Sequence, residues 1–318
     1  MSGALVPLWT DAPGAGRELA RRLAEGLVPR AAAADLAHLI THGWVLWEGA
    51  IEAALIDRFV AGIRSCHHHP GMFISTDHRR GSAQLKLSGS EPDAFESLFD
   101  LYANLPAARD VALHPRLAQF LALMFQARPI AFQQLLFQRS NGHPPHQDTA
   151  FVAVEQPMQL AATWVALEDV TEGSGELGWY DASHTLAPMI FADGSPRFGA
   201  ADDRAAYAAA LEAACRERGF PYRTLLAKKG DVFFWTAGLV HRSHPRRLAE
   251  TTSRLSCVTH YCPATTAPFW FRFFPDNRTL QPHGIGAFAS AYYPLPIGER
   301  MAPPNAGVPH APQPGSSP

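Results

Sequence analysis

Two residues with the chemistry of metal ligands, His146 and Asp148, stand two positions apart in the segment 141–148, which reads NGHPPHQD. On an extended strand, residues two apart point to the same face, so this imidazole and this carboxylate would lie side by side. Both groups bind divalent metal ions. The spacing therefore predicts part of a metal site.

The third ligand that we expect is His241, at the end of the segment 230–241, which reads GDVFFWTAGLVH. Two histidines and one carboxylate form the facial triad of non-haem Fe(II) oxygenases, which leaves three coordination positions open. The same three groups also suit Zn²⁺. The simpler alternative, in which His146 and Asp148 are solvated residues of a Pro-Gly turn, leaves His241 without a role.

The remaining histidines favour structural interpretations. The run His67-His68-His69 is followed by Pro70-Gly71 and predicts a loop, because adjacent side chains cannot all face one centre. Among the isolated histidines, we expect His143 to be a turn residue or a neighbour of the metal ligands, and His184 to cap a turn. We expect His244 to be exposed to solvent and His260 to be a hydrogen-bonded core residue.

Composition bounds the class of protein. The chain has 318 residues, 47% hydrophobic and 18% charged, which fits one large globular domain or two small ones. A net charge of -2 suggests no nucleic-acid or membrane partner, and no apolar run is long enough to span a bilayer. The N-terminus lacks a secretory pattern, and the four cysteines are scattered, so we expect reduced core cysteines and a cytoplasmic protein. Few lysines with much Ala and Pro suggest a GC-rich bacterial genome.

The first part of the chain, residues 1–130, is predicted to be mostly helical. Apolar residues at helical spacing and Ala, Leu and Arg content indicate helices, and two short apolar runs indicate strands. The expected helices are 17–27, 31–41, 51–63, 91–102 and 115–125, and the expected strands are 43–47 and 83–87.

From residue 131 to 265 the pattern changes to short strands separated by Gly and Pro turns, which favours a sandwich or barrel of jelly-roll type. The expected strands are 132–138, 146–154, 159–167, 177–180, 223–226, 231–235 and 254–261. A helical insert is predicted at about 200–219, where Gly219 ends the helix. Residues 266–301 form a C-terminal extension, and the Pro- and Gly-rich residues 302–318 are predicted to be a disordered tail.

Taken together, these segments resemble the phytanoyl-CoA dioxygenase family of Fe(II)/2-oxoglutarate oxygenases over most of the chain. The similarity rests on the order and spacing of several motifs. They are 42–51 (HGWVLWEGAI), the His-x-Asp segment, 163–170 (TWVALEDV), 175–177 (GEL), 183–184 (SH), 230–241 and 253–256 (SRLS). The segment 178–184 departs from the family because it lacks the usual Pro-Gly before Ser-His, and the loop from His241 to Arg254 is slightly long.

The resemblance implies a mainly β protein with flanking helices, whose double-stranded β-helix core (a cupin-like jelly roll) is wrapped by N-terminal helices. It implies Fe(II) bound by His146, Asp148 and His241. It also implies 2-oxoglutarate as co-substrate with O₂, and succinate and CO₂ as co-products. The reaction would be hydroxylation, or a related two-electron oxidation, of an unactivated C–H bond. Related halogenases have a small residue where Asp148 stands, so halogenation is not expected.

The family's co-substrate arginine follows the second histidine by just over ten residues, and Arg254 fits this position best because Arg246 and Arg247 come too early. Arg also suits the far carboxylate chemically, since its guanidinium is planar and bidentate. A hairpin from His241 to Arg254 would place one residue at the iron and the other at the far end of the pocket. Ser243 and Trp164 match further pocket residues, and Lys86, Gln133 or Gln134 is the candidate for the upstream residue that assists co-substrate binding.

Two other functions share these residues. A zinc-dependent hydrolase or isomerase could use the same triad, but it has no need of Arg254 as a co-substrate anchor. A non-catalytic jelly-roll binding protein would not need intact ligands. The expected partner is a small molecule, and the oligomeric state is left open. A CoA ester is not favoured because no adenine or pyrophosphate site is evident. Four aromatic residues could line an apolar pocket or belong to the ordinary core: Trp179, Tyr180, Phe191 and Phe198.

Overall fold

The computed structural model describes residues 5–66, 68–77, 84–87, 97–140, 142–199, 202–248, 253–273 and 278–295. The helices are α1 (Ala15–Ala24), α2 (Ala33–His42), α3 (Ala53–Cys66), α4 (Pro106–Ala112), α5 (Pro115–Phe125) and α6 (Arg204–Glu217). The strands are β1 (Trp44–Trp47), β2 (Ile74–Asp77), β3 (Gln84–Leu87), β4 (Ser97–Phe99), β5 (Pro129–Phe137), β6 (Ala161–Ala166), β7 (Leu177–Tyr180), β8 (Tyr222–Leu225), β9 (Val232–Thr236), β10 (His241–Ser243), β11 (Ser256–Pro263), β12 (Gln281–His283) and β13 (Gly286–Phe288).

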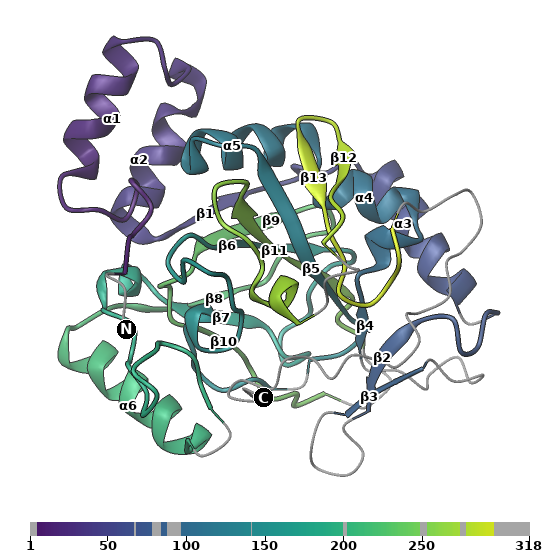
Figure 1. Ribbon diagram of the computed structural model, residues 1–318. Helices are drawn as coiled ribbons and strands as arrows, with labels where there is room; N and C mark the ends of the chain where they lie inside the picture. The colour runs from purple at the N-terminus through teal and green to yellow at the C-terminus, as the bar shows by residue number, and fades with distance from the viewer. Residues whose placement is uncertain are drawn as a thin grey trace.

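Two sheets make up the β structure (Figure 1). The large sheet has the order β1-β9-β6-β11-β5-β4-β2-β3, and β13 joins it in parallel with β5 while pairing with β12. The small sheet has the order β10-β7-β8. Every other strand pair within the described ranges is antiparallel. This arrangement confirms the predicted cupin-like core with flanking helices.

The central strands of the large sheet are buried on both faces, which explains why their sequences are almost continuously apolar. Successive residues alternate between two apolar clusters. Val165 and Phe234 belong to the core under the helices, whereas Trp164, Phe233 and Trp235 belong to the core between the two sheets. Residues on the second of these faces are therefore the ones that can reach a site between the sheets.

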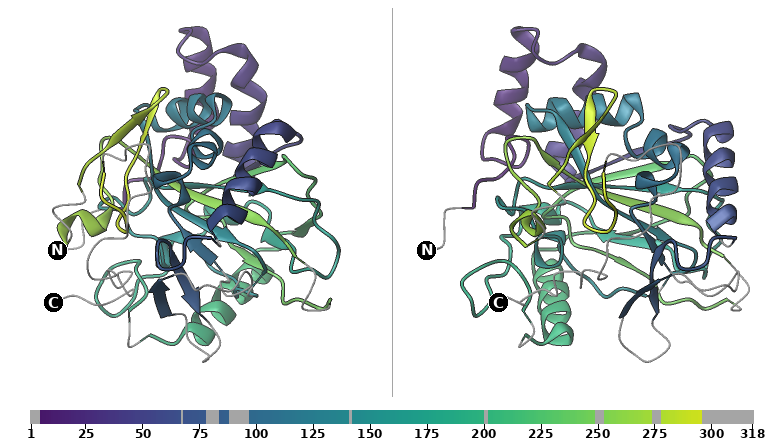
Figure 2. Two further views of the ribbon diagram at one scale, coloured as in Figure 1. Left: turned by 90° about the vertical axis from the view of Figure 1, so that its right-hand side faces the viewer. Right: turned by 45° about the vertical axis from the view of Figure 1, so that its right-hand side comes forward.

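The helices α3, α4 and α5 cover one face of the large sheet, and the small sheet with α6 lies on the other side (Figures 1 and 2). The contact between α5 and the large sheet is aromatic near β1, where the rings of Phe120 and Trp47 meet edge to face with their centroids 5.0 Å apart. On the opposite side, the Tyr180 hydroxyl of β7 donates a hydrogen bond to Glu212 of α6 at 3.1 Å. None of the helices in the described ranges is long and apolar enough to cross a bilayer.

Most predicted elements are present, with bounds that differ by a few residues, but two predictions were wrong. The predicted strand 146–154 is a single β-bridge at His146 followed by a 3₁₀ turn, Asp148–Ala150. The predicted helix 91–102 is wrong where the structure describes it, because Ser97–Phe99 is strand β4 and Leu101–Ala103 is a 3₁₀ turn. Residues 91–96 and the predicted tail 302–318 lie outside the described residues.

The buried residue Asp100 joins three parts of the fold. Its Oδ1 accepts a hydrogen bond from the Gln134 backbone N–H of β5 at 2.7 Å, and its Oδ2 accepts one from the Ser290 hydroxyl at 2.7 Å. Its own N–H donates to the Gln134 carbonyl at 2.8 Å. Its φ of 47° is left-handed, a conformation that Asp and Asn adopt more readily than most residues. Burial raises the pKa of Asp100 to about 7. The carboxyl group thus ties the C-terminal extension to the large sheet.

We predict that Asp100→Ala lowers the free energy of unfolding by roughly 2–4 kcal/mol, because two buried donors lose their acceptor and Ala is disfavoured at positive φ. Asp100→Asn should cost clearly less, since Asn keeps an acceptor oxygen and tolerates this φ. Urea denaturation of both variants measures the difference. A variant Asp100→Ala as stable as the parent would contradict the role of Asp100 as a tie between elements.

Candidate active site

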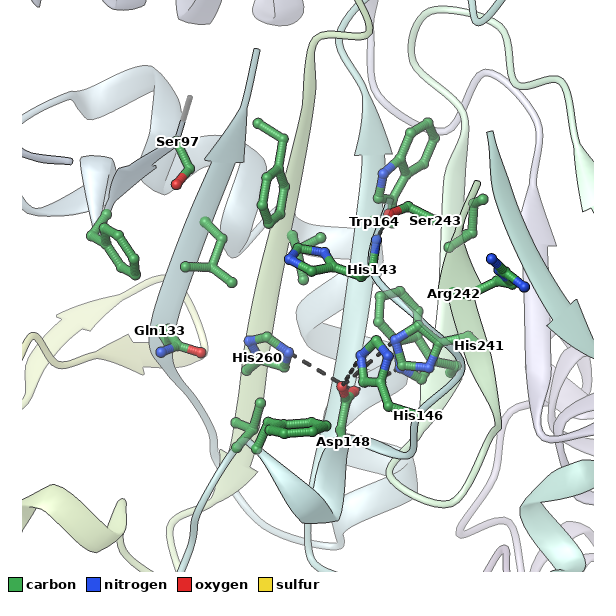
Figure 3. Close-up of a pocket in the computed structure, with 18 of the residues that line it drawn as sticks. Ser97, Gln133, His143, His146, Asp148, Trp164, His241, Arg242, Ser243 and His260 are labelled. Carbon is green, nitrogen blue, oxygen red and sulfur yellow. Dashed lines mark hydrogen bonds and ion pairs between the residues drawn. The ribbon is translucent and has the colours of Figure 1, made fainter. Parts of the chain in front are cut away.

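A cavity of about 280 Å³ lies between the two sheets. Its wall combines apolar side chains with a cluster of histidines, one carboxylate and arginines (Figure 3). The lining residues are Ser97, Phe99, Gln133, Leu135, Phe137, His143, His146, Asp148, Phe151, Val152, Trp164, Leu177, Arg204, Trp235, His241, Arg242, Ser243, Arg254, Val258 and His260.

The two histidines at the centre of this cavity are brought together by their own backbones. His146 N donates to His241 O and His241 N donates to His146 O, each at 3.0 Å, so the segment after β5 is paired with the start of β10. Residues that exchange both hydrogen bonds lie directly opposite each other. The imidazole rings are accordingly close, with centroids 4.3 Å apart.

Asp148 joins the histidines because the residue between it and His146 is extended. Gln147 has φ -102° and ψ 142°, which places His146 and Asp148 on one side of the chain even though no long strand forms there. The Gln147 side chain points to the other side, where its Nε2 donates to the carbonyl of Gly238 at 2.8 Å. The expectation of a shared face was therefore correct, although the strand that motivated it was wrong.

Each imidazole is oriented by a backbone carbonyl on its far side. His146 Nδ1 lies 2.8 Å from the Pro144 oxygen, and His241 Nδ1 lies 3.0 Å from the Leu239 oxygen. A carbonyl only accepts hydrogen bonds, so both Nδ1 atoms carry the proton of the neutral ring. Both Nε2 atoms then present a lone pair, as metal-binding histidines do.

The carboxylate of Asp148 completes the cluster, with one oxygen facing the two histidines and the other bonded to Trp235. Oδ1 lies 3.9 Å from His146 Nε2 and 3.6 Å from His241 Nε2. Oδ2 accepts a hydrogen bond from the Trp235 indole N–H at 2.7 Å. One ligand atom from each of His146, Asp148 and His241 lies within 4.8 Å of the others, which suits a divalent metal ion such as Fe(II).

The charge states of these groups also suit a metal ion. Burial, together with the neighbouring His241, lowers the pKa of His146 to about 3, so its imidazole is neutral at physiological pH. Burial by itself raises the pKa of Asp148, but the adjacent His241, His260 and His146 outweigh it and hold that pKa below its ordinary value. The set therefore offers a neutral imidazole from His146 and an anionic carboxylate from Asp148.

Arg254 is the buried cation of the cavity wall, with 3% of its surface exposed. Its Nη1 donates to the Gly175 carbonyl at 2.8 Å, and its guanidinium lies 5.8 Å from the Trp164 ring centroid. Its Nε finds no hydrogen-bond partner among the described residues. Burial lowers the pKa of Arg254 to about 10, against the opposing effect of Glu176 and Glu168, so the group stays protonated at neutral pH. A carboxylate bound in the cavity could satisfy both the charge and the free donor.

The structure distinguishes among the other candidates. Gln133 lines the cavity, whereas its neighbour Gln134 points to the opposite side, where its Oε1 accepts the Tyr102 N–H at 3.0 Å. Ser243 lines the cavity, and its Oγ accepts the His143 N–H at 2.8 Å. Trp164 lines the wall beside Arg254.

Two of the cations considered for co-substrate binding, Lys86 and Arg247, do not have a described side chain in the cavity wall. Lys86 belongs to β3, opposite Ser75, and its side chain lies outside the described atoms. Arg247 is 69% exposed and lies 3.6 Å from Glu172 and 3.7 Å from Glu176, so it faces acidic side chains rather than the cavity.

One expectation about the surroundings of the site was wrong. His241 does not end a strand in a hairpin with Arg254; it begins β10 of the small sheet, while β11 belongs to the large sheet. The four aromatic residues, for which a pocket and the core were both open, pack in the core: Trp179 lies between the sheets, and Tyr180, Phe191 and Phe198 pack with Tyr207 of α6.

The isolated histidines also take definite places. His260 is a buried core residue, as expected, and its Nε2 lies 3.8 Å from Asp148 Oδ2. His184 lies in a 3₁₀ turn with its Nε2 3.2 Å from the Ile40 oxygen. His244 is not solvent-exposed as expected but half-buried, with its Nε2 2.8 Å from the Tyr222 hydroxyl.

Several residues of the cavity were not singled out from the sequence, among them Trp235, Phe151 and Arg204. Trp235 could have been found, because it alternates with Phe234 on β9 and faces the same side as Phe233. Phe151 and Arg204 carried no comparable signal, since one follows an irregular turn and the other begins an inserted helix.

Comparison with known proteins gives one family and a set of similar folds. The family model described as "Phytanoyl-CoA dioxygenase (PhyH)" matches residues 41–250. No match is found among curated protein sequences.

Three solved structures illustrate the similar folds. The epimerase SnoN from nogalamycin biosynthesis is 20% identical, with a TM-score of 0.56 over 84% of this chain and 95% of that one. The carbocyclase SnoK from the same biosynthesis is 14% identical, with a TM-score of 0.55 over 87% and 96%. EctD from S. alaskensis is 16% identical, with a TM-score of 0.55 over 72% and 76%. At these identities the comparison establishes a shared fold.

We predict that Trp235→Phe weakens metal binding by about 10- to 100-fold while leaving the fold intact, because the indole N–H that orients Asp148 is lost and the ring volume is largely kept. Trp47→Phe is the matched control, since the Trp47 indole N–H donates to a carboxylate away from the cavity, Asp35, at 2.7 Å. Titration of both purified variants with Fe(II) under nitrogen measures the affinity. Equal affinities in the two variants would show that Trp235 does not position the carboxylate.

Proposed function

The chain belongs to the phytanoyl-CoA dioxygenase family, and from this premise we propose that it is an Fe(II)- and 2-oxoglutarate-dependent dioxygenase that oxidises an unactivated C–H bond of a small molecule. The observation that carries the proposal is the presence of a His-Asp-His cluster and a buried arginine in the wall of one cavity. The two features match the two requirements of such an enzyme, a metal with open positions and an anchor for a dicarboxylate.

In this proposal the metal ligands are His146, Asp148 and His241, through two Nε2 atoms and Oδ1. Three protein ligands on one face leave three positions for co-substrate and O₂. Bound Fe(II) would supply, with 2-oxoglutarate and O₂, the oxidising power that removes a hydrogen atom from the substrate, with succinate and CO₂ as co-products. The protein contributes the fixed imidazole tautomers and the oriented carboxylate.

Arg254 is proposed to bind the far carboxylate of 2-oxoglutarate. Its guanidinium is buried and is held by the Gly175 carbonyl, so it needs little reorganisation to receive an anion. Ser243, Trp164 and Gln133 line the same cavity and are the proposed secondary contacts, and Lys86 remains a candidate on the basis of family resemblance alone.

The similar structures support this choice of cofactor without fixing the reaction. One is described as SnoN in complex with Fe3+, alpha ketoglutarate and nogalamycin RO, and another as EctD with 2-oxoglutarate and 5-hydroxyectoine. Their descriptions include an epimerase and a carbocyclase. We propose hydroxylation, or a related two-electron oxidation, for this chain. If Fe(II) is bound by this cluster, the carboxylate of Asp148 would take the position that a halide would otherwise need.

The zinc hydrolase and the non-catalytic binding protein are less well supported. A hydrolase would have no use for a buried arginine beside the metal site, and a binding protein would not need ligands with fixed tautomers. We further propose a cytoplasmic enzyme, because all four cysteines, Cys66, Cys215, Cys257 and Cys262, are free and buried.

We predict that the purified protein binds one Fe(II) and forms succinate from 2-oxoglutarate under air, slowly without a primary substrate, and that His241→Ala abolishes both properties. Removal of one ligand leaves only two groups, which no longer define a face. His244→Ala is the matched control, because His244 is three residues away and does not line the cavity. Iron content and succinate release are the measurements. Full activity in His241→Ala would refute the assigned cluster.

We predict that Arg254→Ala weakens 2-oxoglutarate binding by about 30- to several-thousand-fold and leaves Fe(II) bound, because truncating one partner of a buried charge pair costs roughly 2–5 kcal/mol. The control is Arg247→Ala, which removes an exposed arginine near the same turn. Calorimetric titration of 2-oxoglutarate into the iron-loaded proteins without O₂ gives the affinities. Unchanged affinity in Arg254→Ala would show that Arg254 is not the anchor of the co-substrate.

A further inference from the structure

Besides Arg254, the cavity wall carries two arginines, Arg204 and Arg242, that the metal site and the co-substrate site do not use. Arg204 is the first residue of α6 and lines the cavity wall. Its guanidinium lies 4.8 Å from the Phe151 ring centroid, and Phe151 in turn meets the His146 ring edge to face at 5.6 Å. One aromatic ring therefore separates this cation from a proposed metal ligand.

The position of Arg204 is fixed relative to the metal-binding segment. The Gln147 N–H, between His146 and Asp148, donates to the Tyr207 hydroxyl of α6 at 3.2 Å. The Phe198 N–H, ahead of α6, donates to the Ala150 carbonyl at 2.9 Å. The helix start is itself fixed, because the Asp203 side chain accepts hydrogen bonds from the Ala205 and Ala206 N–H groups. The cation is thus held at a defined place by the same segment that presents the metal ligands.

Arg204 has no anionic partner within the described part of the chain. No carboxylate there forms an ion pair with it, and the nearest acidic residue in sequence, Asp203, is engaged in capping the helix. Desolvation lowers the pKa of Arg204, and no carboxylate opposes that shift. The side chain is exposed at the mouth of the cavity, where its guanidinium lies over an aromatic ring without a counter-charge among the described residues, and an anionic ligand would complete such a site.

The rest of the cavity indicates what such a ligand looks like. Beside the metal cluster the wall is apolar, formed by Phe99, Leu135, Phe137, Val152 and Val258. With a volume of about 280 Å³, the cavity is at the lower end of the roughly 300–1,000 Å³ range of small-molecule sites, and 2-oxoglutarate must share it. A substrate would therefore place a small apolar portion inside and extend a polar end past Phe151.

We propose that Arg204 binds an anionic group of the primary substrate, so that the substrate is a small organic anion whose apolar portion carries the oxidised carbon. This inference rests on the proposed function, since it assumes that 2-oxoglutarate occupies Arg254. The anion is a carboxylate or a phosphate, since both fit a guanidinium. Arg204 acts here as a specificity-determining residue that contacts the substrate at a distance from the reacting carbon.

The test uses matched probes in place of the unidentified substrate. The probes are phenylalkanoates with two to six carbons in the acid chain, the phenylalkanols of equal chain length, and the corresponding phenylalkyl phosphates. Each is titrated calorimetrically into the Fe(II)- and 2-oxoglutarate-loaded protein without O₂. We expect one or more of the anions to bind the parent at least about tenfold more tightly than its alcohol, as a charged hydrogen bond would give. The affinities of the acids and of the phosphates are then compared, and the tighter series shows whether the site prefers a carboxylate or a phosphate.

The variants assign this preference to one side chain. Arg204→Ala should remove the preference for the anion while leaving alcohol binding unchanged, and Arg204→Lys should retain part of it. Arg216→Ala is the matched control, because Arg216 is on the same helix, is 71% exposed and pairs with Glu212. If the parent shows no preference for any anion, or if Arg204→Ala keeps the preference, the inference is overturned.

Two further measurements separate this inference from the function on which it rests. Anion binding is repeated at two saturating concentrations of 2-oxoglutarate. If the affinity for the anion falls in proportion to the rise in 2-oxoglutarate concentration, the anion competes for the co-substrate site and the role of Arg204 is overturned. Iron content and 2-oxoglutarate affinity are measured for each sample. A parent protein that binds neither refutes the proposed function, whereas one that binds both without any anion preference refutes only the role of Arg204.

Discussion

The candidate site depends on one pair of backbone hydrogen bonds, those exchanged between His146 and His241. This pair joins the segment after β5, a strand of the large sheet, to β10 of the small sheet. Without it, the two histidines would belong to separate layers of the fold. Because the pairing acts through the main chain, the side chains remain available, and each Nδ1 atom is then fixed by a carbonyl only two residues away in sequence. The geometry of the cluster is thus set locally, while its position is set by the meeting of the two sheets.

The electrostatics of the cavity follow from burial. A carboxylate that is 2% exposed and an arginine that is 3% exposed are both costly to hold in a fold unless each has compensating partners. Asp148 has the Trp235 N–H and three neighbouring imidazoles, and Arg254 has the Gly175 carbonyl with Glu176 nearby. These partners offset part of the cost, and the Arg254 Nε is left without a hydrogen-bond partner among the described residues. A metal ion and a dicarboxylate are the ligands whose charges would complete the balance.

How far the sequence predicts this arrangement depends on whether a feature is local. The strands of the core could be predicted because their apolar runs are bounded by turns, and the ligand spacing could be predicted because it needs only one extended residue, Gln147. The segment 97–102 could not, because helix-forming residues such as Leu98 pair with β5 in the folded protein, where tertiary context outweighs local propensity. The residues lining the cavity also depend on which face of each strand meets the small sheet. The sequence therefore left open whether Trp179 lines the pocket or belongs to the core, where the structure has it.

The insertion of α6 separates two tasks within one cavity. The metal cluster and Arg254 are positioned by strands and by the turns next to them, whereas Arg204 comes from the inserted helix α6, whose Tyr207 ring packs on Phe151. Hydrogen bonds at Gln147 and Ala150 connect the two, so the helix is placed accurately without contributing a metal ligand. A substitution on the exposed start of α6 would then change what the cavity binds at little cost to the metal site, because the strands that hold the ligands do not depend on it. Recognition of the substrate and activation of O₂ would thus be carried by different elements, joined only where the His-x-Asp segment contacts the helix.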